Sequence, residues 1–178
     1  MDNDFLKTQD DVCVDLIHCL AKNESEKEAI DSILLDNPMR ITPYLKKLIV
    51  KYDSIRKQFL PSPLESETHG TATPFEEGKK TSPIYGLERL YRDRVLLTPH
   101  FDCPAYCRFC YKKSRVMRNR KSMTLADIDL AVAEVGKMQD VRGALITGGD
   151  PFMDRNKLFY LLDKLMTLDN IAEIRVGT

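Results

Sequence analysis

The feature that most constrains the fold is an alternation of short apolar runs and amphipathic segments, which begins near residue 90. Two segments, 125–138 and 155–168, carry apolar residues at helical spacing, and Thr124 and Asp154 precede them as predicted N-caps. Asp127 completes a predicted capping box with Thr124. Three apolar runs flank these helices and are predicted to be buried strands: 94–98, 143–147 and 171–176. The order β–α–β–α–β predicts an α/β fold with a parallel sheet and right-handed crossovers.

The number of predicted strands is too small for a closed barrel. Three parallel strands with two covering helices leave a strand near residue 176 as an exposed sheet edge. We therefore expect the chain to be a fragment that holds the opening βαβαβ part of a partial TIM-type barrel.

The sequence before residue 90 divides into two parts. Residues 1–59 are predicted to form a helical N-terminal region, and 60–89 an extended connector rich in Pro, Ser, Thr and Gly. Three amphipathic segments are expected in the helical region: around 13–20, 24–35 and 44–59. Thr42 is the predicted N-cap of the third segment. The barrel portion then covers 90–178.

Composition favours an intracellular protein that uses cysteine for chemistry. The chain has 43% hydrophobic and 30% charged residues, and no apolar run approaches the ~20 residues of a membrane span. The first residues lack the features of a signal peptide, so we expect a cytoplasmic protein with no membrane contact. Five cysteines in such a chain favour metal binding or catalysis over disulfides. Cys13 and Cys19, in the first helical segment, are predicted to be buried thiols.

A basic run, 108–121, contains no acidic residue. It could be a nucleic-acid patch, a solvated loop, or positive charge around an anionic cofactor or substrate. Its position beside three cysteines favours the third interpretation, and no nucleic-acid partner is expected.

Three of the cysteines, Cys103, Cys107 and Cys110, have the spacing C-x3-C-x2-C. A tight loop with this spacing can direct three thiolates at one iron–sulfur cubane, and the fourth iron then stays open for a small molecule. Structural zinc is the main alternative, with His100 as the one nearby candidate for a fourth ligand. The loop follows a predicted strand, at the end where barrel enzymes place their chemistry.

These cysteines, with the aromatic Phe109 directly before the last one, resemble the signature of the radical S-adenosylmethionine (radical SAM) superfamily. The sequence Gly148-Gly149-Asp150-Pro151, after the second predicted strand, resembles the second motif of that superfamily. The fold that the resemblance implies is a partial TIM-type radical SAM barrel.

The resemblance also implies the roles of these residues. The three cysteines would hold a [4Fe–4S] cluster whose open iron chelates the amino and carboxylate groups of S-adenosylmethionine. Phe109 would contact the adenine, and Gly148, Gly149 and Asp150 would belong to the cofactor site. The two glycines would allow close backbone approach to the methionine amino group. A reductant such as ferredoxin or flavodoxin would supply the electron that yields a 5′-deoxyadenosyl radical.

Within the superfamily, the sequence is similar to lysine 2,3-aminomutase and its relatives over roughly 37–178. The similar stretches follow one another in order: 55–61, 82–87, 91–97, 103–110, 144–150 and 174–177. This resemblance implies an isomerase that shifts the amino group of an amino acid between neighbouring carbons, with pyridoxal 5′-phosphate (PLP) as a further cofactor. The lysine that binds PLP in the family lies beyond residue 178. A homo-oligomer is a further expectation.

Two positions depart from the aminomutase pattern. Lys112 and Lys113 stand where the family has arginines, one of which binds the carboxylate of the substrate, and lysine cannot form the same bidentate contact. Lys112 is the predicted substrate-binding residue, with exposed solubilising charge as the alternative. The family arginine that meets the PLP phosphate corresponds to Leu90, so Arg89 or Arg92 is a candidate to replace it.

The sequence is also consistent with two other functions. One is a different radical SAM reaction that does not use PLP. The other is a non-catalytic iron–sulfur protein for electron transfer or sensing. Phe109 and the glycine motif disfavour a carrier, which needs no site for adenine or methionine.

Overall fold

The structure is a computed structural model that describes residues 21, 23–66, 82–89, 91–116 and 121–178. The chain forms two compact units. The helical unit comprises Met1–Ala72 and Pro104–Met117, and the sheet unit comprises Thr73–Cys103 and Arg118–Thr178. Within the described ranges, no helix has the length and apolar character that crossing a membrane requires. The predicted division at residues 59 and 89 stays a prediction.

The sheet unit contains a four-stranded sheet in the order β1-β2-β3-β4. Its strands are β1 Leu87–Glu88, β2 Arg94–Leu97, β3 Gly143–Ile146 and β4 Glu173–Val176. Strands β2, β3 and β4 are parallel, with Leu97 opposite Ile146 and Ile146 opposite Val176, so the predicted parallel sheet is confirmed. Strand β1 pairs antiparallel with β2 and was not predicted, because two residues are too few to show an alternating pattern.

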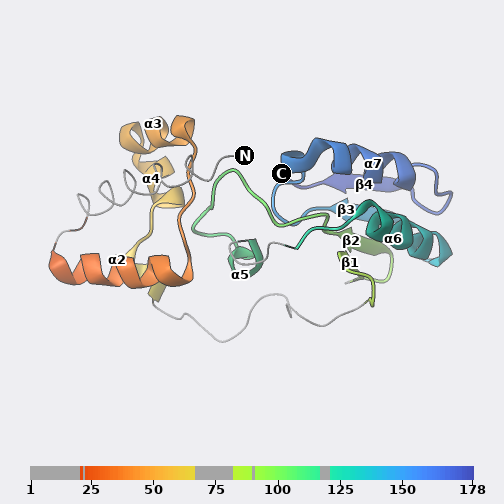
Figure 1. Ribbon diagram of the computed structural model, residues 1–178, viewed down its shortest axis with the longest axis horizontal. Helices are drawn as coiled ribbons and strands as arrows, with labels where there is room; N and C mark the ends of the chain where they lie inside the picture. The colour runs from red at the N-terminus through yellow and green to blue at the C-terminus, as the bar shows by residue number, and fades with distance from the viewer. Residues whose placement is uncertain (1–20, 22, 67–81, 90, 117–120) are drawn as a thin grey trace. The chain divides into compact units, whose positions relative to one another are not determined.

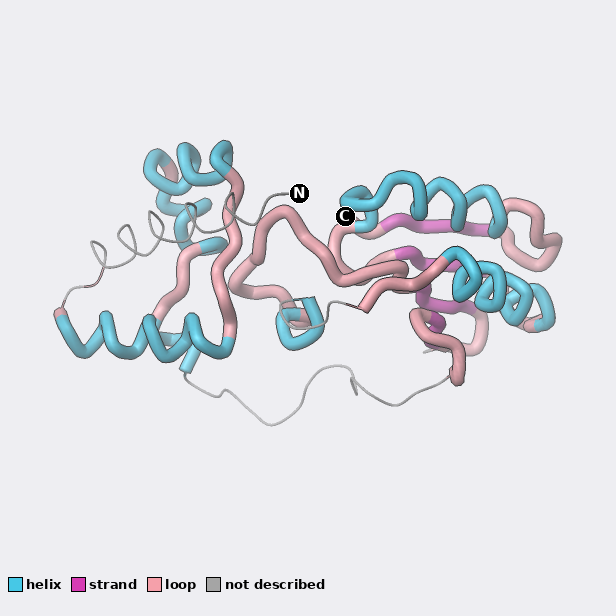
Figure 2. The backbone as a smooth tube through the Cα atoms, in the orientation of Figure 1, coloured by secondary structure: helices cyan, strands magenta, loops and turns pink. Residues whose placement is uncertain are grey.

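Two helices, α6 Leu125–Lys137 and α7 Arg155–Leu165, run beside these strands (Figures 1 and 2). Helix α6 begins with the predicted capping box, in which the Thr124 side chain accepts from the Asp127 N–H and the Asp127 carboxylate accepts from the Thr124 N–H. Asp154 caps α7 as predicted, although this helix ends three residues before the expected 168. A short 3-10 helix, η2 Pro151–Asp154, precedes α7.

The helices and the sheet of this unit share one apolar core. Residues that alternate along β2 and β3, such as Val95 and Ile146, face fully buried residues of the helices, such as Ile128 and Leu161. This pattern is expected when helices cover a sheet face and the strand side chains alternate in direction.

The helical unit contains α2 Glu24–Asp36, α3 Pro43–Lys51, α4 Asp53–Phe59, the 3-10 helix η1 Pro63–Ser66 and α5 Lys113–Val116. Asn23 caps α2 and Thr42 caps α3, the latter as predicted. A small apolar cluster forms its core: Ile30, Ile41, Ile49 and Leu60.

The prediction of one helix over 44–59 is wrong. Tyr52 has extended backbone, with φ −125° and ψ 118°, and it ends α3 and begins α4. The apolar periodicity continues across the break, so it could not distinguish one helix from two. The predicted first helix, with Cys13 and Cys19, lies outside the described residues.

Candidate functional site

The glycine motif follows β3 and packs against the chain that leaves β2. A Cβ on Gly148, whose φ is +132°, would lie 2.3 Å from the carbonyl oxygen of His100, and a Cβ on Gly149 would lie 2.1 Å from that of Asp102. The N–H of Gly149 donates to the His100 carbonyl at 3.0 Å, and the N–H of Asp150 donates to the Asp102 carbonyl at 2.8 Å. The two glycines are thus needed for contact with the protein's own backbone, a role that the sequence did not indicate.

Asp150 ties this motif to its surroundings. Its Oδ1 accepts from the Phe152 N–H at 3.1 Å, which caps η2, and from the Thr178 hydroxyl at 2.8 Å. The backbone and side chain of Asp150 therefore both hold the turn after β3 in one conformation.

His100 lies in the same part of the sheet unit and is buried. Its Nδ1 accepts from the Asp102 N–H at 3.2 Å, an interaction that places the proton of the neutral ring on Nε2. Among the described residues, Nε2 of His100 is the buried side-chain polar atom without a hydrogen-bond partner.

The three cysteines of the predicted cluster site are free thiols, each partly exposed. The boundary between the two units falls between Cys103 and Pro104. In the helical unit, the Cys110 N–H donates to the Cys107 carbonyl at 3.1 Å, which forms a turn between these two predicted ligands. Burial, followed by the neighbouring Cys110, raises the pKa of the Cys107 thiol above its ordinary value.

This pair of thiols fits an iron–sulfur group. Two neighbouring thiolates repel each other, and a bound metal cation compensates their charge. Within the described part of the chain, no three His, Cys, Asp or Glu side chains are grouped as a metal site. The ligand assignment of Cys103, Cys107 and Cys110 therefore stays a prediction, as does the choice between a cluster and zinc.

Residues 105–110 alternate in exposure. Tyr106 and Arg108 are buried, whereas Phe109, the predicted adenine contact, is 70% exposed. The buried residues hold the loop on the helical unit: the Tyr106 N–H donates to the Arg40 carbonyl, and the Arg108 N–H to the Gln58 carbonyl, both at 2.8 Å. No regular spacing links these partners, so no sequence pattern could predict the contacts.

Lys112 is not exposed solubilising charge, so that alternative is wrong for this residue, whereas the side chain of Lys113 is 33% exposed. Lys112 is only 7% exposed, and its ammonium lies 5.6 Å from the centre of the Tyr111 ring. Lys113 lies 3.6 Å from a carboxylate oxygen of Glu65. Lys112 and Lys113 therefore make contacts within the helical unit, whereas Lys121, at the end of the basic run, lies 4.0 Å from the centre of the Tyr85 ring in the sheet unit.

Arg89, a candidate for the PLP phosphate, donates to Asp140 at 2.6 Å, and Arg92 lies 3.9 Å from the same carboxylate. Asp140 precedes β3, so this ion pair lies at the amino end of the strand, opposite to the glycine motif. Neither arginine gains support as a phosphate ligand.

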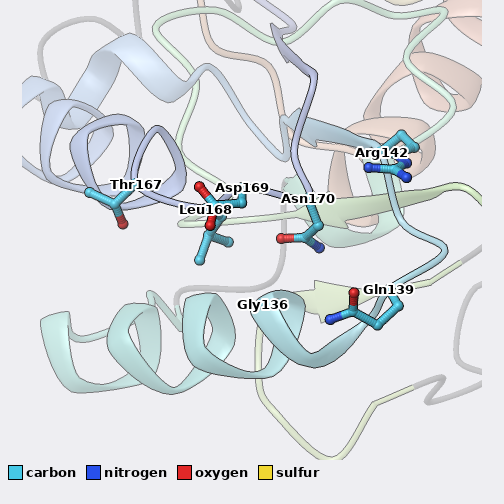
Figure 3. A pocket seen from close by; sticks show the side chains of 7 residues that line it. All are labelled: Gly136, Gln139, Arg142, Thr167, Leu168, Asp169 and Asn170. Atoms are coloured by element: carbon cyan, nitrogen blue, oxygen red, sulfur yellow. The ribbon is translucent and has the colours of Figure 1, made fainter.

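A pocket of about 380 Å³ also lies at the amino ends of β3 and β4 (Figure 3). Its lining residues are Gly136, Gln139, Arg142, Thr167, Leu168, Asp169 and Asn170. The Asn170 amide donates to the carbonyls of Val135 and Met138 at 3.0 and 3.1 Å, which joins the loop before β4 to the end of α6. This end of a barrel sheet usually serves stability, which favours a structural role for the pocket.

Comparison with known proteins agrees with the fold and the motifs. Residues 97–178 match the model of the Radical SAM superfamily. An L-lysine 2,3-aminomutase from Acetoanaerobium sticklandii is 32% identical over 160 residues, which cover 86% of this chain and 38% of the relative. The enzyme of that name from Methanococcus maripaludis is 30% identical over 163 residues, or 88% of this chain and 37% of the relative.

Residues 97–178 belong to the radical SAM superfamily. Within it, the chain is similar to the lysine 2,3-aminomutases over most of its length. A glutamate 2,3-aminomutase from Clostridioides difficile is also similar, at 24% identity over 159 residues, 87% of this chain and 38% of the relative. The chain spans about two fifths of the length of these relatives.

Proposed function

We propose that the protein is a radical SAM enzyme in which Cys103, Cys107 and Cys110 hold a [4Fe–4S] cluster. The observation that carries this proposal is the cysteine triad itself, made of free, partly exposed thiols after β2, within a chain of this superfamily. When bound, the cluster would supply the electron that splits the sulfonium of S-adenosylmethionine.

The residues around the triad have roles that suit this cofactor. The exposed ring of Phe109 offers a flat apolar surface on which adenine can stack. The turn at Gly148 and Gly149 lies beside the start of the cysteine loop, and backbone carbonyl oxygens there are suitable acceptors for an ammonium group. Asp150 supports this turn through its hydrogen bonds.

The proposed reaction is the 1,2-shift of an amino group in an amino acid, with PLP as a second cofactor. The similarity to lysine and glutamate 2,3-aminomutases supports an amino-acid substrate and leaves its side chain open. We assign Lys112 to the substrate carboxylate. Its buried ammonium is a point charge, so it would attract the carboxylate without the two parallel bonds of arginine.

The proposal is tested by anaerobic reconstitution of the protein with iron and sulfide, followed by S-adenosylmethionine and dithionite. We expect cluster absorbance at about 400 nm and formation of 5′-deoxyadenosine. Alanine at any one of Cys103, Cys107 or Cys110 should remove both signals, whereas Cys13→Ala and Cys19→Ala serve as controls and should keep them.

Two results would contradict the proposal. A protein that holds a stable cluster but forms no 5′-deoxyadenosine would be a cluster carrier. Loss of the cluster in Cys13→Ala would refute the ligand assignment. Addition of PLP with lysine or glutamate, and detection of the β-amino isomer, then tests the proposed amino shift separately.

A further inference from the structure

Arg108 stands between two predicted cluster ligands, yet its side chain is only 4% exposed. Its Nε and Nη2 donate to the two carboxylate oxygens of Glu65, each at 2.9 Å. Its Nη1 donates to the carbonyl of Asn37 at 2.9 Å and to that of Pro38 at 3.4 Å. All three nitrogens of the guanidinium are therefore engaged.

The partners come from two separate segments of the helical unit. Asn37 and Pro38 follow the end of α2, and Glu65 lies in η1. Glu65 is itself only 13% exposed and is fixed further, because its Oε1 accepts from the Ser62 N–H at 3.2 Å. The guanidinium is thus held by groups that are themselves fixed.

The backbone of the loop is held at the same place. The N–H groups of Tyr106 and Arg108 donate to the carbonyls of Arg40 and Gln58. Since Cys107 lies between Tyr106 and Arg108, its backbone is held on both sides by these hydrogen bonds. A buried ion pair adds little net stability compared with apolar packing, because both charges lose their hydration. Its geometric restraint is strong, since the bidentate contact accepts one orientation.

We propose that the Arg108–Glu65 ion pair is a positioning device for the cysteine loop, and that it sets the direction of Cys107 and Cys110. Arg108 and Glu65 are positioning residues, because they act on the cluster site through the loop. The proposal deepens the function proposed above and rests on it for the identity of the cluster.

The first test does not need a cluster. In the metal-free protein, the alkylation rate of each cysteine by iodoacetamide is followed by peptide mass spectrometry. We expect Cys107 and Cys110 to react about tenfold faster in Arg108→Met, equivalent to roughly 1.4 kcal/mol of lost local stability. Cys103 belongs to the other unit and should react at the rate of the unchanged protein.

Milder variants separate positioning from folding. Arg108→Lys keeps the charge but not the fork, and Glu65→Gln keeps one acceptor oxygen and loses the charge. Both should keep the unfolding midpoint closer to that of the unchanged protein than Arg108→Met does. Lys164→Met is the matched control, since it breaks the 3.0 Å ion pair with Asp129 in the sheet unit and should change no cysteine rate.

The second test uses the reconstituted cluster. The three helical-unit variants should lose iron to a chelator about tenfold faster, and the electron paramagnetic resonance line shape of the reduced cluster should change. Unchanged alkylation rates, chelation rates and line shapes in Arg108→Lys and Glu65→Gln would overturn the proposal. So would equal acceleration at Cys103, which would indicate general unfolding. A failure of the unchanged protein to bind a cluster would instead count against the proposed function, and the alkylation test would still decide the role of Arg108.

Discussion

The two units position the ends of the predicted site by different physical means. In the sheet unit, the glycine motif follows a strand that is fixed by a large apolar core on α6 and α7. In the helical unit, the apolar cluster is small among the described residues, and an ion pair and backbone hydrogen bonds hold the cysteine loop. Loss of apolar volume should therefore destabilise mainly the sheet unit, and loss of polar contacts should destabilise mainly the helical unit.

The largest effect is expected from removing apolar volume in the sheet unit. Ile128 and Ile49 are both fully buried, one in each unit. Ile128→Ala should lower the free energy of unfolding by about 2–5 kcal/mol, because it leaves a cavity in a well-packed core. Ile49→Ala should cost less, since the smaller cluster can relax around the cavity. Denaturant unfolding followed by circular dichroism measures both, and equal losses would remove the contrast between the units.

A smaller effect is expected from the glycine motif. Gly149→Ala places a Cβ against the backbone at Asp102 and should cost about 1–3 kcal/mol, because backbone cannot yield as a side chain does. Gly136→Ala is the matched control in α6: its Cβ would meet only a methyl group of Leu168, at 3.2 Å. It gains up to about 1 kcal/mol of helix propensity, so it should be close to neutral. Equal thermal destabilisation by the two changes would show that the close approach after β3 is unimportant.

The smallest effect concerns the helix caps and depends on pH. Thr124→Ala and Thr42→Ala each remove an N-cap, at a cost of about 1 kcal/mol. Hydrogen bonds from the backbone and side chain of Thr124 hold the pKa of Asp127 below its ordinary 3.8. The carboxylate therefore contributes stability that is present above pH 3.8 and is lost as the pH falls through the lowered value.

The pH series distinguishes the two caps. Thr124→Ala removes the hydroxyl but keeps the backbone N–H, which is the larger cause of the lowered pKa of Asp127. The variant should therefore flatten the fall of the unfolding free energy below pH 3.8 only in part, whereas Thr42→Ala should lower stability at every pH alike. Urea titrations at several pH values measure both variants. A parallel shift of the Thr124→Ala curve would mean that the Thr124 hydroxyl does not lower the pKa of Asp127.

The sequence predicted the elements whose side chains are periodic and whose caps are local. Strands β2 and β3, the capping box of α6 and the cap of α7 depend on residues within a few positions of each other, so a pattern can reveal them. The break at Tyr52 was missed, because the helical periodicity continues across it.

The contacts of the candidate site were harder to predict. The pairing of Arg108 with Glu65 joins segments that are distant in the sequence, and no periodic pattern indicated the burial of Lys112. The sequence does mark the three cysteines and the two glycines, because the chemistry itself fixes their types and spacing. No local sequence pattern marks the residues that hold these cysteines and glycines in place.

The different burial of Tyr106, Arg108 and Phe109 has a consequence for directed evolution. The variants of a library randomised over this loop would differ in two independent properties, which are docking of the loop and binding of a ligand. At Tyr106 and Arg108, variants would be eliminated by failure of the loop to dock on the helical unit, before any cofactor is added. At the exposed Phe109, variants would differ only in how they bind a ligand. Substitutions that are meant to change activity should therefore be introduced at Phe109, with the buried Tyr106 and Arg108 kept unchanged.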